Sequence, residues 1–349
     1  MSATYRTIAW NPNKRRYDLV AGSLIGGFVV TALAVQAALR QELTIETLVI
    51  RALGAAAFTL LHVILGIGPL ARLDRRFLPL LYNRRHLGVM MFTLALGHGA
   101  FSMVQFHALG ALNPLVSVLV SNPRYTTIGQ LPFQPFGVAA LAIVFLMAAT
   151  SHDFWLHNLT APVWKALHMC VYVAYTFIVL HVVFGVLQGE TSRLLGWVLC
   201  AGALTVFTLH ALAARQEARG DRENQNARKD GFVDVCGVSE IPEKRAVMTC
   251  LSGERVAVFL HDGRISAISN VCQHQNGPLG EGRIVNGCVV CPWHGYEYAP
   301  DTGASPPPFT EKVPTFDVRV VAGRVLVHPQ PNAPGTRVEP ARLVTARTA

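Results

Sequence analysis

The chain has 349 residues, of which 51% are hydrophobic and only 15% are charged. A soluble domain usually carries about 25% charged residues, so part of this chain is too apolar for water. The formal net charge of +9 is compatible with a nucleic-acid partner by its sign alone. The basic residues, however, gather at the ends of apolar runs and not in an aromatic-interleaved patch, so we expect no nucleic-acid partner.

Residues 17–214 contain repeated apolar runs close to the ~20 residues that cross a bilayer. We expect an all-α bundle of six membrane-spanning helices here, after a short cytosolic N-terminus over residues 1–16. The first run is too long for the apolar part of a secretory signal and lacks a convincing cleavage site, so it should remain as a span. The predicted spans are Leu19–Leu39, Thr47–Leu70, Leu87–Leu109, Phe136–Thr150, Trp164–Leu187 and Leu194–Ala213.

Lysine and arginine are distributed unevenly among the segments that flank these spans. They precede the first span, fill the second connecting loop, mark the fourth boundary with Lys165 and follow the sixth span, whereas the intervening loops are poor in them. The positive-inside rule therefore predicts a multi-pass protein of the cell inner (plasma) membrane, surrounded by lipid, with both termini in the cytoplasm. The marker residues are Lys14, Arg15, Arg16, Arg72, Arg75, Arg76, Arg84, Arg85, Lys165, Arg215, Arg219 and Arg222.

The remainder of the chain has the composition of a soluble protein. Residues 215–230 lack apolar periodicity and are expected to form a charged linker or the frayed end of the sixth helix. Over residues 231–330, short alternating runs separated by turn pairs predict a small all-β domain with hairpins. Residues 331–349 are rich in Pro, Arg and Thr, and we expect a disordered tail. The turn pairs are Ser252-Gly253, Asp262-Gly263, Asn286-Gly287 and Ala322-Gly323.

Two short cysteine–histidine motifs stand within the predicted β domain. Cys272 and His274 form a C-x-H pair, and Cys291 and His294 form a C-x-x-H pair. In a Rieske centre two thiolates bind one iron and two imidazoles bind the other, so each motif would supply one ligand to each iron. The alternative is a tetrahedral zinc site. Zinc sites usually pair cysteine with cysteine and histidine with histidine, so this spacing favours the iron–sulfur interpretation.

Residues 231–330 resemble the Rieske [2Fe-2S] domain family, in particular the ferredoxins of oxygenase systems. The resemblance rests on the CQH and CPWHG motifs and on the trailing Gly303, Pro306–Pro308 and Phe316–Val327. It implies a Rieske-type [2Fe-2S] cluster whose ligands are Cys272, His274, Cys291 and His294.

Three positions distinguish this chain from other branches of that family. Gly277 and Trp293 stand where cytochrome bc-type members carry a disulfide that bridges the two loops, and the absence of that disulfide suits a reducing cytosol. Tyr296 stands where high-potential members usually place a serine that donates to a cluster sulfide. Fewer such hydrogen bonds imply a lower reduction potential.

Several histidines lie within or just inside the apolar runs. A neutral histidine bound to a neighbouring helix would explain any single one, although an ionisable residue in a span is by default a functional hypothesis. Several together favour haem, whose iron takes axial imidazoles from facing helices. Glycines on both sides of His98 would admit a porphyrin, or equally a closely packed helix. These histidines are His62, His98, His168 and His181.

A second resemblance covers roughly residues 45–200, which are similar to the ferric reductase transmembrane family. Within that family the similarity is greatest to the haem-binding membrane subunit of the bacterial methionine sulfoxide reductase system, and NADPH oxidases are more distant. It implies b-type haem with ligands at His98, His168 and His181, whereas His62 and His86 stand outside the pattern. The resemblance rests on Arg84-Arg85-His86-Leu87-Gly88, Thr150-Ser151 and Trp164-Lys165-Ala166-Leu167-His168, together with His98 and His181.

Depth in the membrane suggests how these histidines pair. At 1.5 Å per residue, His98 and His181 lie roughly 20 and 24 Å from the cytoplasmic ends of their spans, which makes them the predicted axial pair. His168 lies only about 5 Å in and would need a second haem. Depth favours His86 as its partner, whereas burial in an apolar span favours His62. The sequence therefore predicts one or two haems.

The soluble domain has neither a G-x-G-x-x-G turn nor the length for a nucleotide-binding βαβ fold. We therefore expect an oxidoreductase component that takes electrons from a cytosolic reductase or ferredoxin and has no catalytic residue of its own. Its cluster and haem would pass electrons to a quinone, ferric, oxygen or periplasmic protein acceptor, with the direction of flow open. The alternative is a redox sensor, or a membrane-tethered Rieske ferredoxin that serves a separate oxygenase, with the helices only as an anchor.

Overall fold

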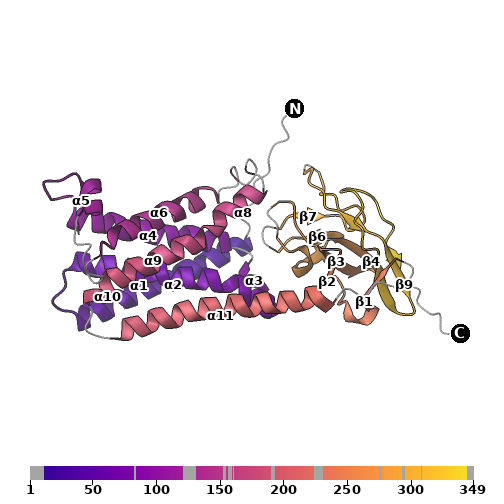
Figure 1. Ribbon diagram of the computed structural model, residues 1–349, viewed down its shortest axis with the longest axis horizontal. Coiled ribbons are helices and arrows are strands. Elements are labelled where there is room, and N and C mark those ends of the chain that lie inside the picture. Colours follow the sequence, from indigo (N-terminus) through magenta and orange to yellow (C-terminus); the bar gives the residue numbers. More distant parts are fainter. Residues whose placement is uncertain are drawn as a thin grey trace, which may run out of the picture. The chain divides into compact units, whose positions relative to one another are not determined.

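The computed structural model describes residues 12–81, 84–120, 131–151, 155, 159, 161–189, 193–223, 231–274, 277–292, 295–307 and 309–343. The chain divides into two compact units (Figure 1). The helical unit lies within Trp10–Pro69 and Asn83–His210, and the other unit takes in Ala211–Ala349 together with Leu70–Tyr82.

Within the described residues, five helical runs are long and apolar enough to cross a membrane. The apolar helix α6 (Gln134–Ala149) has only 16 residues, so its length is roughly 24 Å, less than the ~30 Å of a bilayer core. The predicted membrane helix bundle followed by a small β domain is confirmed, and the expected six spans are corrected to five long spans and one shorter helix. The long spans are α1 (Pro12–Leu39), α2 (Ile45–Leu73), α4 (Arg84–Phe106), the run Ala166–Gln188 and α11 (Leu194–Glu223).

Shorter helices make up the rest of the described helical residues. The span Ala166–Gln188 is assembled from three of them, because the helix is interrupted at Cys170 and again at Gly185. Helix α11 continues to Glu223, so the start of the predicted linker is helical, while residues 224–230 lie outside the described residues. The short helices are η1 (Arg75–Phe77), α3 (Leu78–Leu81), α5 (Pro114–Val120), α8 (Ala161–Met169), α9 (Val171–Phe184) and α10 (Val186–Gly189).

Helix α2 is the most enclosed helix of the bundle. Half of the residues in the most apolar stretch of α2 are buried inside the protein, whereas none of those in the most apolar stretch of α1 are. Figure 1 shows α1, α2, α4, α6 and α9 running side by side, and α6 packs along both α4 and α9. Carbonyl groups of α2 and of the start of α6 are therefore available to bind side chains from neighbouring helices: α2 binds one from α4, and the start of α6 binds one from α9.

The β domain is built of short antiparallel strands in three sheets (Figure 1). The sheet orders are β1-β10-β9, β11-β4-β3-β2 with β8 also on β4, and β5-β6-β7. Apolar side chains between the sheets form two cores, and Phe259 and Phe316 are fully buried in them. The strands are β1 (Val233–Gly237), β2 (Ala246–Leu251), β3 (Glu254–His261), β4 (Arg264–Ser269), β5 (Arg283–Val285), β6 (Cys288–Val290), β7 (Glu297–Tyr298), β8 (Thr315–Phe316), β9 (Val318–Val321), β10 (Arg324–Val327) and β11 (Ala341–Arg342).

All four predicted turn pairs join neighbouring antiparallel strands. Between β2 and β3, Ser252 and Gly253 have φ angles of 50° and 83°. Two consecutive positive φ angles are what a type I′ hairpin turn requires. The other three pairs have positive φ at both residues as well, so the predicted hairpins are confirmed.

Residues 331–343 lie along the sheet, which corrects the expectation of a disordered tail for this part of 331–349. The N–H of Leu343 donates to the carbonyl of Gly263 at 2.9 Å, and strand β11 pairs with β4. The sequence is rich in proline, but proline is compatible with an edge strand because it need not donate to the ladder. Residues 344–349 lie outside the described residues.

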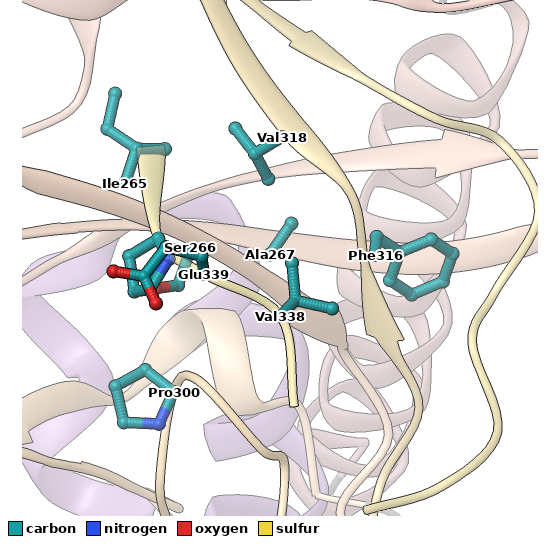
Figure 2. A pocket seen from close by; sticks show the side chains of 9 residues that line it. Ile265, Ser266, Ala267, Pro300, Phe316, Val318, Val338 and Glu339 are labelled. Atoms are coloured by element: carbon teal, nitrogen blue, oxygen red, sulfur yellow. The ribbon is translucent and has the colours of Figure 1, made fainter. Parts of the chain in front are cut away.

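Figure 2 shows the seam between this C-terminal segment and the sheet. Val338 and Glu339 face Ile265, Ala267 and Phe316 across it. The space between them is too narrow to admit a water molecule, so the seam is a packing contact and not a ligand pocket.

Candidate functional site

The two cysteines of the predicted cluster lie in the loops that follow β4 and β6. Cys272 and Cys291 are each only 1% exposed, and both belong to the same apolar core as Tyr298. His274 follows in the first loop, whereas His294 lies outside the described residues. Two buried thiols that come from two loops and belong to one core fit the thiolate half of a Rieske centre.

Main-chain hydrogen bonds shape both loops around their cysteines. The N–H of Cys272 donates to the carbonyl of Gly277 at 2.9 Å, and the N–H of Cys291 donates to the carbonyl of Tyr296 at 2.7 Å. Gly295 has a φ of 73°, a backbone conformation that favours glycine, and its N–H donates back to Cys291 at 2.9 Å. These bonds tie Cys291 to Gly295 and Tyr296 and so fix the position of the cysteine.

The imidazole of His274 stacks on the ring of Tyr296, with centroids 4.8 Å apart and planes 11° from parallel. The hydroxyl of Tyr296 donates to the carboxylate of Glu311. Burial, followed by the hydrogen bond to Glu311, raises the pKa of Tyr296 above its usual value. The phenol therefore stays protonated, and its hydroxyl is committed to Glu311 while its ring supports His274.

Tyr298, on β7, has a different relation to the cluster residues. Its fully buried hydroxyl accepts the N–H of Gln273 at 3.0 Å and lies 3.4 Å from Sγ of Cys272, to which it can donate its proton. Burial and the neighbouring Cys272 raise the pKa of Tyr298. The sequence interpretation missed this residue. A tyrosine three residues after the CPWHG motif was the available signal, because a buried phenol needs a polar partner.

His98, in α4, reaches across to the main chain of α2. Its Nδ1 lies 2.9 Å from the carbonyl oxygen of Ile50. A carbonyl can only accept, so Nδ1 carries the proton and Nε2 of the neutral ring keeps its lone pair. The ring lies against Gly54, where an added Cβ would come within 2.9 Å of Nδ1.

His181, in α9, is held in the same way at the start of α6. Its Nδ1 lies 2.9 Å from the carbonyl oxygen of Phe133, so this ring also presents an unprotonated Nε2. Gly137 lies beneath it, and an added Cβ there would come within 2.8 Å of Nδ1. Hydrogen bonds of this kind fix the tautomer and orientation of metal-binding imidazoles.

The structure brings these two imidazoles together. Their ring centroids are 6.1 Å apart, and their planes are 88° from parallel. When two imidazoles bind one metal ion from opposite sides, the distance between their centroids is two metal–nitrogen bonds plus half the width of each ring. With bonds of about 2.0–2.1 Å, as imidazole makes to zinc, this distance is roughly 6 Å. The spacing and the shared tautomer therefore fit one metal ion between His98 and His181, as in a haem with two axial imidazoles.

His62 has a different environment, although it also lies in an apolar helix. Its Nδ1 donates to the carbonyl of Phe58 in its own helix at 2.8 Å. Its Nε2 is 3.0 Å from the hydroxyl of Tyr175 and therefore accepts that proton. Both ring nitrogens are used, so the structure does not present His62 as a haem ligand.

His168 and His86 are not brought to each other among the described contacts. Nδ1 of His168 donates to the carbonyl of Trp164 at 3.0 Å, its ring stacks on that indole, and Nε2 is a long 3.5 Å from Ser151. His86 instead pairs with Asp18 of α1 at 2.8 Å.

The glycines beside His98 serve helix packing, because added Cβ atoms there would lie 3.2–3.3 Å from leucines of α2 and α6.

Comparisons with known proteins find a family for each of the two parts of the chain. Residues 231–317 match the Rieske [2Fe-2S] domain, and residues 49–179 match the ferric reductase like transmembrane component. A helical membrane part of the second kind joined to a cluster domain of the first kind defines a multi-pass membrane electron-transfer protein.

The relatives cover the C-terminal domain. The chain is 33% identical over 99 residues to the biphenyl dioxygenase ferredoxin subunit of a Pseudomonas species, which is 28% of this chain and 90% of that protein. It is 28% identical over 109 residues to the ferredoxin component of the alkene monooxygenase system of Xanthobacter autotrophicus, 30% of this chain and 89% of that protein. The solved ferredoxin of carbazole 1,9a-dioxygenase from Nocardioides aromaticivorans shares 26% identity and covers 28% of this chain and 98% of its own, with a TM-score of 0.27. The chain belongs to the Rieske [2Fe-2S] family through this domain, and that assignment supports a [2Fe-2S] cluster within it.

Proposed function

We propose that this protein transfers electrons between a cytosolic donor and an acceptor reached through the membrane, using one [2Fe-2S] cluster and one b-type haem. The observation that carries the proposal is the pair His98 and His181, whose centroids are 6.1 Å apart and whose Nδ1 atoms are both held by carbonyls. A bundle that served only as an anchor would have no need of two such imidazoles inside the membrane.

Four residues of the β domain would hold the cluster. Buried Cys272 and Cys291 would bind one iron, and His274 and His294 would bind the other. When bound, the cluster and the haem would each take up and release single electrons. The protein's own contribution is to fix the thiols in a dry core, support His274 on Tyr296 and set the tautomers of the membrane imidazoles.

The partners are inferred from chemistry and from the relatives. Two of the similar proteins are ferredoxin components of oxygenase systems, so we propose a soluble reductase or ferredoxin as the donor on the cytosolic side. A quinone, a ferric complex, oxygen or a periplasmic protein would be the acceptor. A placement in the inner membrane with both termini in the cytoplasm follows from the distribution of lysine and arginine.

An optical and EPR study of the purified full-length protein tests the proposal. We expect one low-spin haem per chain and a rhombic signal with low average g from the reduced cluster. His98→Ala and His181→Ala should each abolish the low-spin haem, because either change leaves iron without one strong ligand. His62→Ala is the matched control and should retain it, since both nitrogens of His62 are already used.

Four results would contradict the proposal in different ways. Protein without Soret absorption would favour the second candidate, a membrane-tethered ferredoxin, which the names of the relatives also suggest. Two haems per chain, one of them lost in His168→Ala, would show that a single haem is wrong. A zinc-loaded, EPR-silent β domain, or an EPR signal unchanged by His294→Cys, would refute the proposed cluster ligands.

A further inference from the structure

The two paired imidazoles are held by the same local arrangement on two different helices. Each accepting carbonyl lies four residues, about one helical turn, before a glycine: Ile50 before Gly54, and Phe133 before Gly137. The imidazole lies over the glycine and donates to the carbonyl one turn back. We call this combination of a carbonyl and the glycine four residues after it a notch.

Any larger residue in place of the glycine of a notch would clash with the imidazole. An added Cβ at Gly54 would lie 2.9 Å from Nδ1 and 3.1 Å from Cε1 of His98. At Gly137 the same two distances to His181 would be 2.8 and 2.9 Å. Contacts this short require the ring to tilt or slide away, and either movement lengthens the hydrogen bond to the carbonyl and displaces Nε2.

We propose that Gly54 and Gly137 are positioning residues of the haem site, and that each notch fixes the tautomer and the tilt of the axial imidazole it receives. The proposal rests on the proposed function, because it presumes that His98 and His181 hold one iron. Loss of such supporting contacts commonly costs about 10–100-fold in affinity for the bound metal. The three atoms nearest to an added Cβ belong to His98 at Gly54 and to His181 at Gly137, so each glycine would act on the haem through the imidazole.

The chain supplies a matched control for the steric part of this argument. Gly202 of α11 lies against His62, and an added Cβ there would come within 2.6 Å of Nε2. The clash with a membrane imidazole is therefore at least as severe as in either notch. His62, however, is bonded to Phe58 and Tyr175 and not to the proposed haem pair. Gly88 of α4, with nothing within 4 Å of an added Cβ, controls for the substitution itself.

The experiment compares purified full-length Gly54→Ala and Gly137→Ala with Gly202→Ala and Gly88→Ala. The readouts are the g values of the low-spin ferric haem and the rate at which haem is lost to an acceptor protein. We expect both notch variants to change the g values and to lose haem about 10–100-fold faster, whereas both controls keep the wild-type behaviour.

A second measurement covers the case in which the notch variants do not fold. The His98→Gly substitution removes the ring with which a new methyl group at residue 54 would clash, so His98→Gly/Gly54→Ala should be accommodated. Free imidazole added to His98→Gly should restore a low-spin spectrum, and it should bind at least about 10-fold more weakly to the double variant.

The possible results separate this proposal from the proposed function. Wild-type protein without haem would refute the proposed function itself. Wild-type haem that is unchanged in both notch variants, or changed equally in Gly202→Ala, would overturn only the notch proposal. Equal affinity of free imidazole for the single and the double variant would overturn it as well.

Discussion

The hydroxyl of Tyr298 is the polar group whose contact with the cluster residues can be tested most directly, because it lies 3.4 Å from Sγ of Cys272. A hydrogen bond to a ligand sulfur stabilises the reduced cluster and raises its potential. We expect Tyr298→Phe to lower the midpoint potential by about 20–65 mV, the equivalent of one hydrogen bond of about 0.5–1.5 kcal/mol. A redox titration followed by EPR measures the shift.

Tyr296→Phe is the matched control for that titration. It should keep the ring that stacks on His274 and remove only the hydrogen bond to Glu311, so its effect on the potential should be clearly smaller. An equal or larger shift in Tyr296→Phe would show that the hydroxyl of Tyr298 is not the group that tunes the cluster.

At the level of single residues, the sequence predicts chemistry and depth better than it predicts neighbours. Counting residues along the spans placed His98 and His181 at similar depth, and the structure brings their rings together. Depth carries no information about which way a side chain points around its helix. For that reason the sequence could not show that His62 meets Tyr175, or that His86 meets Asp18.

At the level of elements, the predictions succeeded where the signal was local. Apolar runs marked the long spans, and pairs such as Asp262-Gly263 marked the hairpins, since positive φ is a property of the turn residues themselves. The C-terminal segment was missed because its order comes from contacts with distant residues. Thr315, for example, donates through its hydroxyl to the carbonyl of Thr336 at 2.9 Å.

Removal of residues 331–349 should destabilise the β domain. Beyond the pairing of β11, five hydrogen bonds join the described part of the segment to the domain, and their loss should cost about 2.5–7.5 kcal/mol. Phe316 and Ile265, both fully buried, would also lose cover. We expect a chain truncated after Gln330, with the membrane helices retained, to lose its cluster absorbance at a lower temperature on heating.

The matched control for this truncation is a chain that ends at Leu343, which keeps every described contact of the segment. It should melt like the wild type. If both truncated chains melted like the wild type, the contacts of residues 331–343 would contribute nothing measurable to the stability of the domain.

At the level of the whole molecule, the orientation in the membrane decides from which side electrons enter. The distribution of basic residues predicts a cytoplasmic β domain. A reporter that works only outside the cytoplasm should stay silent when fused after Arg219 and be active when inserted near Asn122, which lies outside the described residues. The reverse pattern would place the cluster on the outer side and contradict the proposed donor.

The notches determine which positions of α2 and of the start of α6 tolerate substitution. The acceptor at each notch is a main-chain carbonyl, a group that every amino acid provides, so the side chains of Ile50 and Phe133 can vary without removing it. The glycines have no such freedom, since even one methyl group at Gly54 or Gly137 meets the imidazole. The ability to hold an imidazole therefore depends on the identity of one residue in each notch, Gly54 on α2 and Gly137 on α6.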